Sequence, residues 1–418
     1  LTVAPHDVEE ITMGEHFACA RSYEGLVKCW GRNLDAALGI GNRTGHIGDG
    51  LHEMGEYQAF TDLGSNLSAV DIDAAAYHVC AAMATGEVRC WGSATNMHLG
   101  IGSSSGYVGD DPNDMGDNMQ VLSPPSGEKF VEVASSREAS CARTDAGNVH
   151  CWGDQAYMLQ HPTINSDFAY SDQRTMPLKD KAVKISMGFG HACALLQTHE
   201  VQCWGQGNSG ELFTGNQSQN NLHQNDPVID FGAGVGVQDI MMGETFSCAI
   251  LTTEGTVCWG SGHQNRNGRS TSNFGNTQNT INAGLGDGIS SPHRLIAQPD
   301  KSDFGPYSSG ACIINEASQV ECWGNNHIAG GPNHRAAPWI IDIGGPARYV
   351  ATGKDVACAV GIDGAIHCWG SNTNGKLGLG DSTDRLYTST TTEPVTLTHE
   401  TTDVRLWNPD TDFDGWKD

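Results

Sequence analysis

The sequence predicts an all-β fold: a seven-bladed β-propeller with four-stranded antiparallel blades and one hairpin disulfide per blade. Three observations predict it. Fourteen cysteines form seven pairs, each ten residues apart, and Trp-Gly follows the second cysteine of every pair. Glycine, at 53 of 418 residues, has nearly double its usual share of about 7%. Only 17% of the residues are charged, which is typical of a turn-rich β-protein rather than a helical one.

The repeated unit is a cysteine hairpin. In the third unit, residues 140–144 and 148–152 flank Asp145-Ala146-Gly147, and a three-residue turn with a left-handed glycine is a favoured hairpin connection. Cysteines that face each other in such a hairpin have Cα atoms about 4.5 Å apart, within reach of a disulfide. Zinc binding is the alternative, but the spacing does not match a zinc knuckle. The predicted disulfides are Cys19–Cys29, Cys80–Cys90, Cys141–Cys151, Cys193–Cys203, Cys248–Cys258, Cys312–Cys322 and Cys358–Cys368.

The sixth residue after the first cysteine lies in the hairpin turn. Glycine occupies it in four units, at Gly25, Gly86, Gly147 and Gly364. The other three units have His199, Glu254 and Ser318 there, and we expect their turns to differ in detail.

Each tryptophan is predicted to fill the core between blades. Side chains alternate along a strand, so Trp30 lies on the face opposite Cys29, beside Ala18 and Ala20 of the partner strand. The equivalent neighbours are small in every unit except for Ile313 in the sixth. Large indoles beside small residues suit interdigitating sheets, which favours core packing over the alternative of sugar-binding platforms. The predicted core residues are Trp30, Trp91, Trp152, Trp204, Trp259, Trp323 and Trp369.

Two further strands are predicted in each unit. An apolar-alternating run precedes the hairpin at 8–13, 69–72, 130–133, 182–187, 237–241 and 348–351. A short run, often opened by proline, follows the long loop at 227–229, 292–296, 338–343 and 394–397. Four-stranded units can close into a ring with only short, protected edges, and the run 8–13 is a candidate for completing the last blade. The predicted propeller spans residues 1–398, with an acidic tail at 399–418 and units at about 8–63, 67–124, 129–178, 182–231, 237–297, 304–343 and 347–398.

The stretches that follow Trp-Gly resemble the regulator of chromosome condensation repeat. The matching motifs are Ala37-Leu38-Gly39-Ile40-Gly41, His98-Leu99-Gly100-Ile101-Gly102 and Lys376-Leu377-Gly378-Leu379-Gly380, with a shortened form at 284–288. The resemblance covers about residues 8–398 and implies the seven-bladed fold. Cys-Trp-Gly with paired cysteines is similar to the secreted bacterial branch of this family. The activity of the nuclear nucleotide-exchange factor is not expected, because a reducing nucleus disfavours disulfides.

Charge and cysteine content restrict the partners and the location. Acidic residues outnumber basic ones 49 to 23, for a formal net charge of −26. Nucleic acid is excluded as the main partner and an anionic membrane is disfavoured, because both need clustered Lys and Arg. No apolar run of about 18 residues exists, so no transmembrane segment is predicted. Paired cysteines predict a secreted or cell-surface protein, and Leu1 in place of Met leads us to expect a processed chain.

No catalytic constellation is found in the sequence. Nucleophile-elbow, zinc-protease, phosphate-loop and dinucleotide motifs are absent, so we predict a non-enzymatic protein without an organic cofactor. His150 and His367 occupy a hairpin position that is Lys28, Arg89 or Gln202 in other units, and we expect them on the surface. N-glycosylation motifs, which also arise by chance in an Asn-rich chain, are at Asn42, Asn66 and Asn216.

Calcium is the one cofactor that the sequence suggests. Carboxylates alternate around Gly415 in the pattern of calcium loops, although an ordinary acidic tail explains them equally well. A complete loop would need chain beyond the last residue. The Gly-Asp segments 47–50 and 108–111 are further candidates, which simple turns also explain. The tail residues in question are Asp410, Asp412, Asp414 and Asp418.

The loops between the repeated motifs are the expected functional surface. They vary in length and content, and the longest spans residues 260–292. Loops beyond about 12–15 residues are usually functional or disordered. The predicted function is a structural or adhesive binding module at the cell surface, as a subunit of an extracellular assembly. The alternative is a soluble receptor or enzyme-inhibitor propeller with one protein partner. Expected partners are a protein or glycan at the cell surface, or a second copy of the chain.

The tail should bind calcium weakly, or only when further chain completes the loop, because its four carboxylates repel one another without a cation. Replacing Asp412→Asn and Asp414→Asn should abolish calcium uptake by the tail in titration calorimetry. Equal uptake by the parent and substituted proteins would assign these residues to an ordinary acidic tail.

Overall fold

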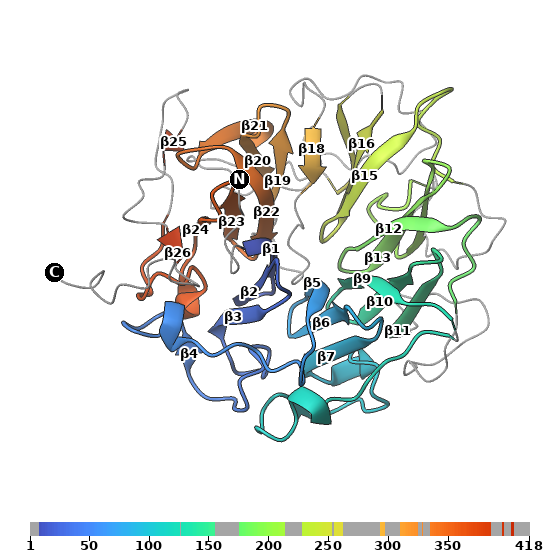
Figure 1. Ribbon diagram of the computed structural model, residues 1–418. Coiled ribbons are helices and arrows are strands. Elements are labelled where there is room, and N and C mark those ends of the chain that lie inside the picture. The colour runs from blue at the N-terminus through green and yellow to red at the C-terminus, as the bar shows by residue number, and fades with distance from the viewer. Residues whose placement is uncertain are drawn as a thin grey trace.

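The computed structural model describes residues 8–125, 127–154, 175–213, 228–252, 255–261, 293–296, 310–324, 328, 335–385, 395–396 and 403–404. In this part of the chain, seven sheets surround a common axis, and blades 1 to 7 follow one another around it in chain order (Figure 1). The predicted all-β, seven-bladed propeller is confirmed. No helix among these residues is long and apolar enough to cross a membrane.

Each blade has three antiparallel strands at equivalent positions. The first strands, which lie nearest the axis in Figure 1, are β1 (Val8–Met13), β5 (Ala69–Ala74), β9 (Phe130–Ser135), β12 (Ala182–Met187), β15 (Val237–Met242), β18 (His293–Ile296) and β22 (Ala347–Gly353). The second strands are β2 (Phe17–Ser22), β6 (His78–Met83), β10 (Ala139–Thr144), β13 (His191–Leu196), β16 (Phe246–Leu251), β19 (Gly310–Asn315) and β23 (Val356–Gly361). The third strands are β3 (Val27–Arg32), β7 (Val88–Ser93), β11 (Val149–Gly153), β14 (Val201–Gly205), β17 (Thr256–Gly260), β20 (Val320–Gly324) and β24 (Ile366–Gly370).

The outer strands differ between blades. β4 (His46–Ile47) and β8 (Tyr107–Val108) complete four-stranded sheets in blades 1 and 2, whereas blades 3 to 5 show three strands within the described residues. Blade 6 adds β21 (Arg335–Asp342) and a fifth strand, β25 (Val395–Thr396), which runs parallel to β21. β26 (Asp403–Val404) is the outer strand of blade 7.

Two of the proline-opened runs belong to other blades than predicted. The run 292–296, expected to close the fifth unit, contains β18, which pairs with β19 as the first strand of blade 6. The run 394–397, expected to close the seventh unit, contains β25 and joins blade 6. The strand that pairs with β24 is instead β26, which lies beyond the predicted propeller boundary at residue 398. A short apolar run carries no signal for the sheet it will join, because its hydrogen-bond partners are distant in sequence.

Blades 1 and 7 meet without exchanging strands in the described residues. The segment Val8–Met13 does not complete the last blade, because β1 pairs with β2 as the first strand of blade 1. Side chains join the two blades instead. The indole N–H of Trp30 donates to the carbonyl of Lys376 at 3.1 Å, and Lys354 Nζ lies 2.7 Å from Glu15 Oε1.

All fourteen cysteines pair within their own hairpins, as predicted. In every blade the two cysteines are register partners, and their Cα atoms are 4.0–4.1 Å apart. The hairpin geometry inferred from the sequence is therefore present in all seven blades.

Each disulfide packs against the tryptophan of the next blade. At the first interface, Cys19 and Cys29 share a buried cluster with Trp91. The same combination recurs around the ring, and the last cluster joins Cys358 and Cys368 to Trp30. All seven indoles are completely buried. Because cysteine and tryptophan alternate along one strand, each blade offers a disulfide to one neighbour and an indole to the other.

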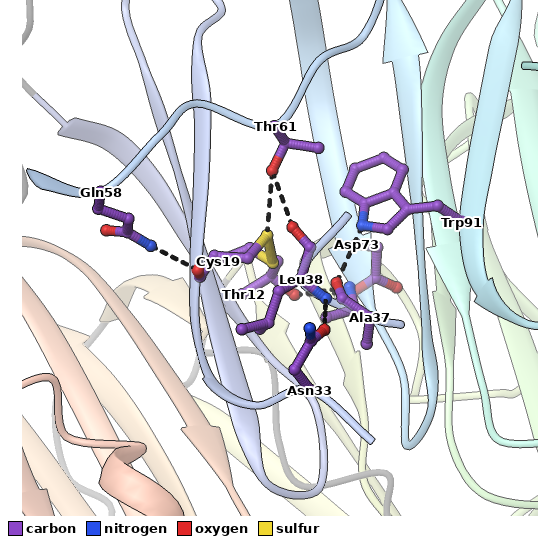
Figure 2. The surroundings of a disulfide bond; sticks show 11 residues. Thr12, Cys19, Asn33, Ala37, Leu38, Gln58, Thr61, Asp73 and Trp91 are labelled. Carbon is purple, nitrogen blue, oxygen red and sulfur yellow. Dashed lines mark hydrogen bonds between the residues drawn. A yellow bond between two sulfur atoms is a disulfide. The ribbon is translucent and has the colours of Figure 1, made fainter. Parts of the chain in front are cut away.

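The Trp-Gly and Leu-Gly motifs serve these interfaces. The glycine after each tryptophan has a φ between 94° and 116°, a conformation that only glycine adopts readily. The indole N–H of Trp91 donates to the carbonyl of Ala37 at 2.9 Å, as Figure 2 shows. Trp152 donates to the carbonyl of His98 at 2.7 Å in the same way. Ala37 and His98 each precede a Leu-Gly pair, so this motif positions the carbonyl that holds the next tryptophan.

The two described turns without glycine adopt the same left-handed conformation as the glycine turns, contrary to our expectation. His199 and Ser318 have φ of 63° and 61°, close to the left-handed glycines at the equivalent position. The carbonyl of His199 accepts the N–H of Val237, in the next blade, at 2.9 Å, and the carbonyl of Ser318 accepts that of Ala347 at 2.7 Å. These contacts hold the turn whatever its side chain is. Glu254 lies outside the described residues.

Removing one disulfide should destabilise the protein without unfolding it. Cys19→Ala with Cys29→Ala should lower the free energy of unfolding by roughly 2–3 kcal/mol, because the unfolded chain is no longer cross-linked. Denaturant titration without reductant measures the loss. Peptide mapping of the non-reduced parent should return seven cross-linked hairpins. Any link between different units would contradict the structure.

Candidate interaction surface

Some of the predicted site residues lie outside the described part of the chain. They are the tail carboxylates, the glycosylation motif at Asn216 and the loop 262–292. The other two glycosylation motifs differ in accessibility. Asn66 is exposed, with φ at 57°. Asn42 is half-buried, and its side-chain oxygen accepts the N–H of Thr44 and an amide proton of Asn33, each at 3.1 Å. Glycosylation stays a prediction, and it fits the surroundings of Asn66 better.

The Gly-Asp segment of blade 1 binds a carboxylate of its own chain. The N–H groups of Gly48, Asp49 and Gly50 all donate to Glu53 Oε2, at 2.9, 3.1 and 2.8 Å. Calcium would need converging oxygens instead. Within the described ranges, no three Asp, Glu, His or Cys side chains converge as a metal site would require. The turn interpretation therefore explains this segment.

The hairpin position of His150 and His367 is buried, not exposed as predicted. The two histidines are 1% and 3% exposed, and Lys28, Arg89 and Gln202 at the same position are also buried. The contacts at this position differ between units. The Lys28 ammonium donates to the carbonyl of Gly55, the Gln202 side chain accepts the N–H of residue 179 at 2.8 Å, and the His150 ring lies edge-on to Phe130 with centroids 5.8 Å apart. Variation between units suggested exposure to solvent, but it reflects different buried contacts.

Exposed apolar side chains concentrate on blade 1. In the described part of the chain, the large apolar residues that are exposed outside this blade are Val70, Val121, Val183 and Ile362. Those on blade 1 are Tyr23, Leu34, Leu51, Tyr57 and Phe60. Leu51 and Tyr57 are 77% and 56% exposed, the first and third highest values in this set. The ring of exposed His52 lies edge-on to Tyr57, with centroids 5.3 Å apart. We call Leu51, His52, Tyr57 and Phe60 the blade-1 patch.

The blade-1 patch belongs to the segment between β4 and β5, which runs along the outer edge of the ring (Figure 1). Four contacts hold this segment against β3. Lys28 Nζ donates to the carbonyl of Gly55 at 2.6 Å and lies 4.7 Å from the centre of the Phe60 ring. The Gln58 amide donates to the carbonyl of Cys29 at 2.5 Å, and Thr61 Oγ1 lies 3.8 Å from Cys29 Sγ (Figure 2). The patch is thus presented by a fixed backbone beside a disulfide.

Lys28 is an unusual anchor for an exposed segment. Burial lowers the pKa of Lys28 to about 8, because an ammonium group loses hydration inside the fold. The acidic neighbours Asp49 and Glu53 border the patch in the chain. The surface therefore combines apolar and aromatic side chains with carboxylates at its margin, a composition found in protein interfaces.

Blade 2 contains the same structural element without the patch. Its residues lie 61 positions further along, and Arg89 replaces Lys28, donating to the carbonyl of Gly116 at 2.6 Å. The short 3₁₀ helices η1 (Gly55–Tyr57) and η3 (Gly116–Asn118) are equivalent. The patch residues correspond to Pro112, Asn113, Asn118 and Val121. Blade 2 is therefore an internal control for blade 1.

Removing the anchor should loosen the patch without unfolding the ring. Lys28→Met should speed amide hydrogen exchange in residues 51–60 and leave residues 112–121 unchanged, because the Gly55 carbonyl loses the lysine that ties it to β3. Arg89→Met should do the reverse. Exchange followed by mass spectrometry measures both segments in one experiment. Unchanged exchange in both variants would show that these side chains do not hold the segments.

Comparisons with known proteins agree with this architecture. Models of the regulator of chromosome condensation (RCC1) repeat match residues 182–211 and 363–404. The chain is 26% identical over 336 residues to the human E3 ubiquitin-protein ligase HERC2, a match that covers 78% of this chain and 6% of HERC2. It is 26% identical over 303 residues to the ultraviolet-B receptor UVR8 of Arabidopsis thaliana, covering 71% of this chain and 62% of UVR8.

Solved structures show the same fold. Human WBSCR16 aligns with a TM-score of 0.65 at 17% identity, covering 90% of this chain and 93% of that one. Yeast RCC1 (Prp20), solved with bound Kap60, aligns with a TM-score of 0.51 at 16% identity, covering 95% and 75%. With RCC1-repeat matches in two blades and seven blades of one pattern, the chain contains RCC1-type repeats, and its propeller is similar to those of RCC1-type proteins.

Proposed function

We propose that this chain is a non-enzymatic, protein-binding propeller that works outside the cell, secreted or at the cell surface. We further propose that it contacts its partner through the blade-1 patch. The observation that carries this proposal is the concentration of exposed apolar side chains on one blade of an otherwise repetitive ring.

The disulfides support the extracellular setting. Seven cross-links, one in each hairpin, form and persist in oxidising compartments and are rare in the reducing cytosol. The net charge of −26 favours a protein partner over nucleic acid. An extracellular setting accounts for both features.

The scaffold supports a binding role. Yeast RCC1 has been solved with Kap60 bound, and the yeast protein Prp20p is described by its binding to Gsp1p and histones. Those partners belong to those proteins, and the match to HERC2 spans 6% of its length, so we do not extend its ligase activity to this chain. What the likeness supports is a rigid ring that presents loops to another protein.

The blade-1 patch has the composition of a binding centre. Interfaces depend on a few aromatic or large apolar anchors surrounded by residues that exclude water. Tyr57 and Leu51 are such anchors, and the lysine-held backbone keeps them in place before the partner arrives, which lowers the ordering cost of binding. The equivalent residues of blade 2, Asn118 and Pro112, offer no such anchor.

Truncating the anchors should weaken binding and leave the fold intact. Leu51→Ala with Tyr57→Ala should weaken binding of the labelled protein to the surface of its source cells at least tenfold, by loss of about 1.4 kcal/mol or more. Val121→Ala on blade 2 is the matched control and should bind normally. Thermal unfolding of both variants should remain close to that of the parent, since exposed substitutions change stability by about 0.5 kcal/mol or less.

Two outcomes would change the proposal. Equal binding by the parent and the Leu51→Ala, Tyr57→Ala variant would exclude the patch. Loss of binding after enzymatic removal of cell-surface glycans, with proteins left intact, would identify a glycan as the partner. Sedimentation of the free protein separates a self-associating structural subunit from a monomeric receptor.

A further inference from the structure

The blade-1 patch is bordered by carboxylates that have no cation partner within the described residues. We call Asp49, Glu53, Asp62, Asp111 and Asp117 the acidic margin. The first three belong to the outer segment of blade 1, and the last two belong to the equivalent segment of blade 2. Asp62, Asp111 and Asp117 are exposed, and Asp49 and Glu53 are half-buried. None of the five takes part in an ion pair in the described part of the chain.

The chain brings few cations to this region. Between Arg43 and Lys129, Arg89 is the only basic residue of the sequence, and it is 6% exposed. Lys28 reaches the region from β3 and is 3% exposed. Both side chains donate to backbone carbonyls, as described above. Their charges are therefore covered by the fold, whereas the carboxylates of the acidic margin are accessible.

Neutral donors fix most of these carboxylates. Glu53 accepts three backbone N–H groups, and Asp62 and Asp111 each accept one, at 3.0 and 2.8 Å. Asp117 accepts the N–H and the hydroxyl of Ser65, at 2.8 and 2.6 Å. These bonds from Ser65 lower the pKa of Asp117. Donors of this kind hold a carboxylate in its ionised form without cancelling its charge.

The acidic margin continues across the joint between blades 1 and 2. The N–H of Gly116 donates to the carbonyl of Asp62 at 2.9 Å, and the bonds from Ser65 to Asp117 lie at the same joint. In the chain, Asp49 lies two residues before the patch, and Asp62 lies two residues after it. The apolar centre is therefore flanked by negative charge. In such an arrangement the centre supplies contact area and the margin selects the partner.

We propose that the partner of the blade-1 patch is a cationic protein segment in which lysine or arginine residues flank an apolar or aromatic residue. This inference rests on the proposed function, because it specifies the partner of the same surface. The apolar residue of the partner contacts Leu51 and Tyr57, and its basic residues lie against Asp62 and Asp117. Opposite charges at the edge of an interface accelerate association and reject partners of the wrong charge.

The same charges disfavour other partners. In a twofold dimer built on this face, the acidic margin would meet its own copy, and like charges across an interface repel. Nucleic acid and anionic lipid carry the same sign as the margin. A metal ion would need converging oxygens, and no three Asp, Glu, His or Cys side chains converge in that way within the described residues. A cationic protein segment satisfies both the apolar centre and its margin.

Asp62→Asn with Asp117→Asn tests the inference. An asparagine oxygen accepts the same backbone N–H groups, so the variant loses charge and keeps its turns. Its association with the surface of the source cells should be at least about threefold slower than that of the parent at low ionic strength. The difference should disappear in about 1 M salt, where charges more than about 3 Å apart are screened.

Asp230→Asn with Asp363→Asn is the matched control. Both aspartates are exposed, and each accepts the N–H of the residue two positions further on, at 2.8 and 3.1 Å, as Asp62 does. They lie away from the outer segments of blades 1 and 2. The control loses the same number of charges and should bind like the parent. Equal slowing in the control would attribute the effect to net charge and overturn the inference.

Two labelled peptides test the charge of the partner directly. A peptide that alternates lysine with leucine and phenylalanine should bind the parent in fluorescence anisotropy. It should bind more weakly to Leu51→Ala with Tyr57→Ala and to Asp62→Asn with Asp117→Asn. The same peptide with glutamate in place of lysine should not bind. Equal binding of the lysine peptide by all three proteins, or binding of the glutamate peptide, would contradict the inference.

The inference and the proposed function fail in different ways. If Leu51→Ala with Tyr57→Ala loses cell binding while Asp62→Asn with Asp117→Asn binds like the parent at every salt concentration, the patch remains the contact site and the cationic partner is wrong. If the Leu51→Ala, Tyr57→Ala variant binds cells like the parent, the patch itself is wrong, and this inference with it. Cell binding of the parent that a calcium chelator abolishes would assign the margin to a bridging metal ion and overturn the inference.

Discussion

The contact between a disulfide and the indole of the next blade is the interaction on which the ring depends. Cysteine and tryptophan occupy opposite faces of one strand, so the contact is directional and its copies must meet head to tail. The seventh disulfide, Cys358–Cys368, meets Trp30, and the ring closes there without an exchanged strand in the described residues. A hairpin cross-linked at its centre keeps the small residues around the cysteines in register, which leaves the space that the neighbouring indole fills.

Backbone and indole N–H groups add hydrogen bonds across the interfaces. Between blades 1 and 2, blade 1 supplies the acceptor of three such bonds, and the hydroxyl of Thr12 donates in the opposite sense, to Asp73 at 3.2 Å. Near the axis, Thr12 Oγ1 accepts the N–H of Ala74; at the turn, the carbonyl of Gly25 accepts the N–H of Ala69; in the core, the carbonyl of Ala37 accepts the indole of Trp91. Each blade thus has a disulfide face and an indole face, and these N–H donors hold the indole face of one blade to the disulfide face of the blade before it.

The sequence was sufficient to predict what depends on neighbours within one hairpin. The disulfides, the turn position and the burial of the tryptophans all follow from spacing within about a dozen residues. It was insufficient where the partner is distant: β18 and β25 were assigned to the wrong blades, and β1 was considered for the last one. Burial of His150 and Lys28 was also missed, because the groups that cover them, Phe130 and the carbonyl of Gly55, lie outside their own hairpins. The sequence predicted that the loops between the repeated motifs form the functional surface, but it did not predict the blade-1 patch.

Comparing blades 1 and 2 distinguishes the residues that the fold needs from those that are free to serve binding. Lys28 and Arg89 differ in chemistry, but each donates to a glycine carbonyl of its own outer segment at 2.6 Å. The difference between them therefore does not indicate a difference in function. Leu51 and Tyr57 stand on an equivalent backbone beside an equivalent disulfide, yet their counterparts are Pro112 and Asn118. Because blade 2 forms the same backbone with proline and asparagine at these positions, folding does not require Leu51 and Tyr57 in blade 1. Their presence, at a cost in solvation, is the feature of this surface that a partner would explain.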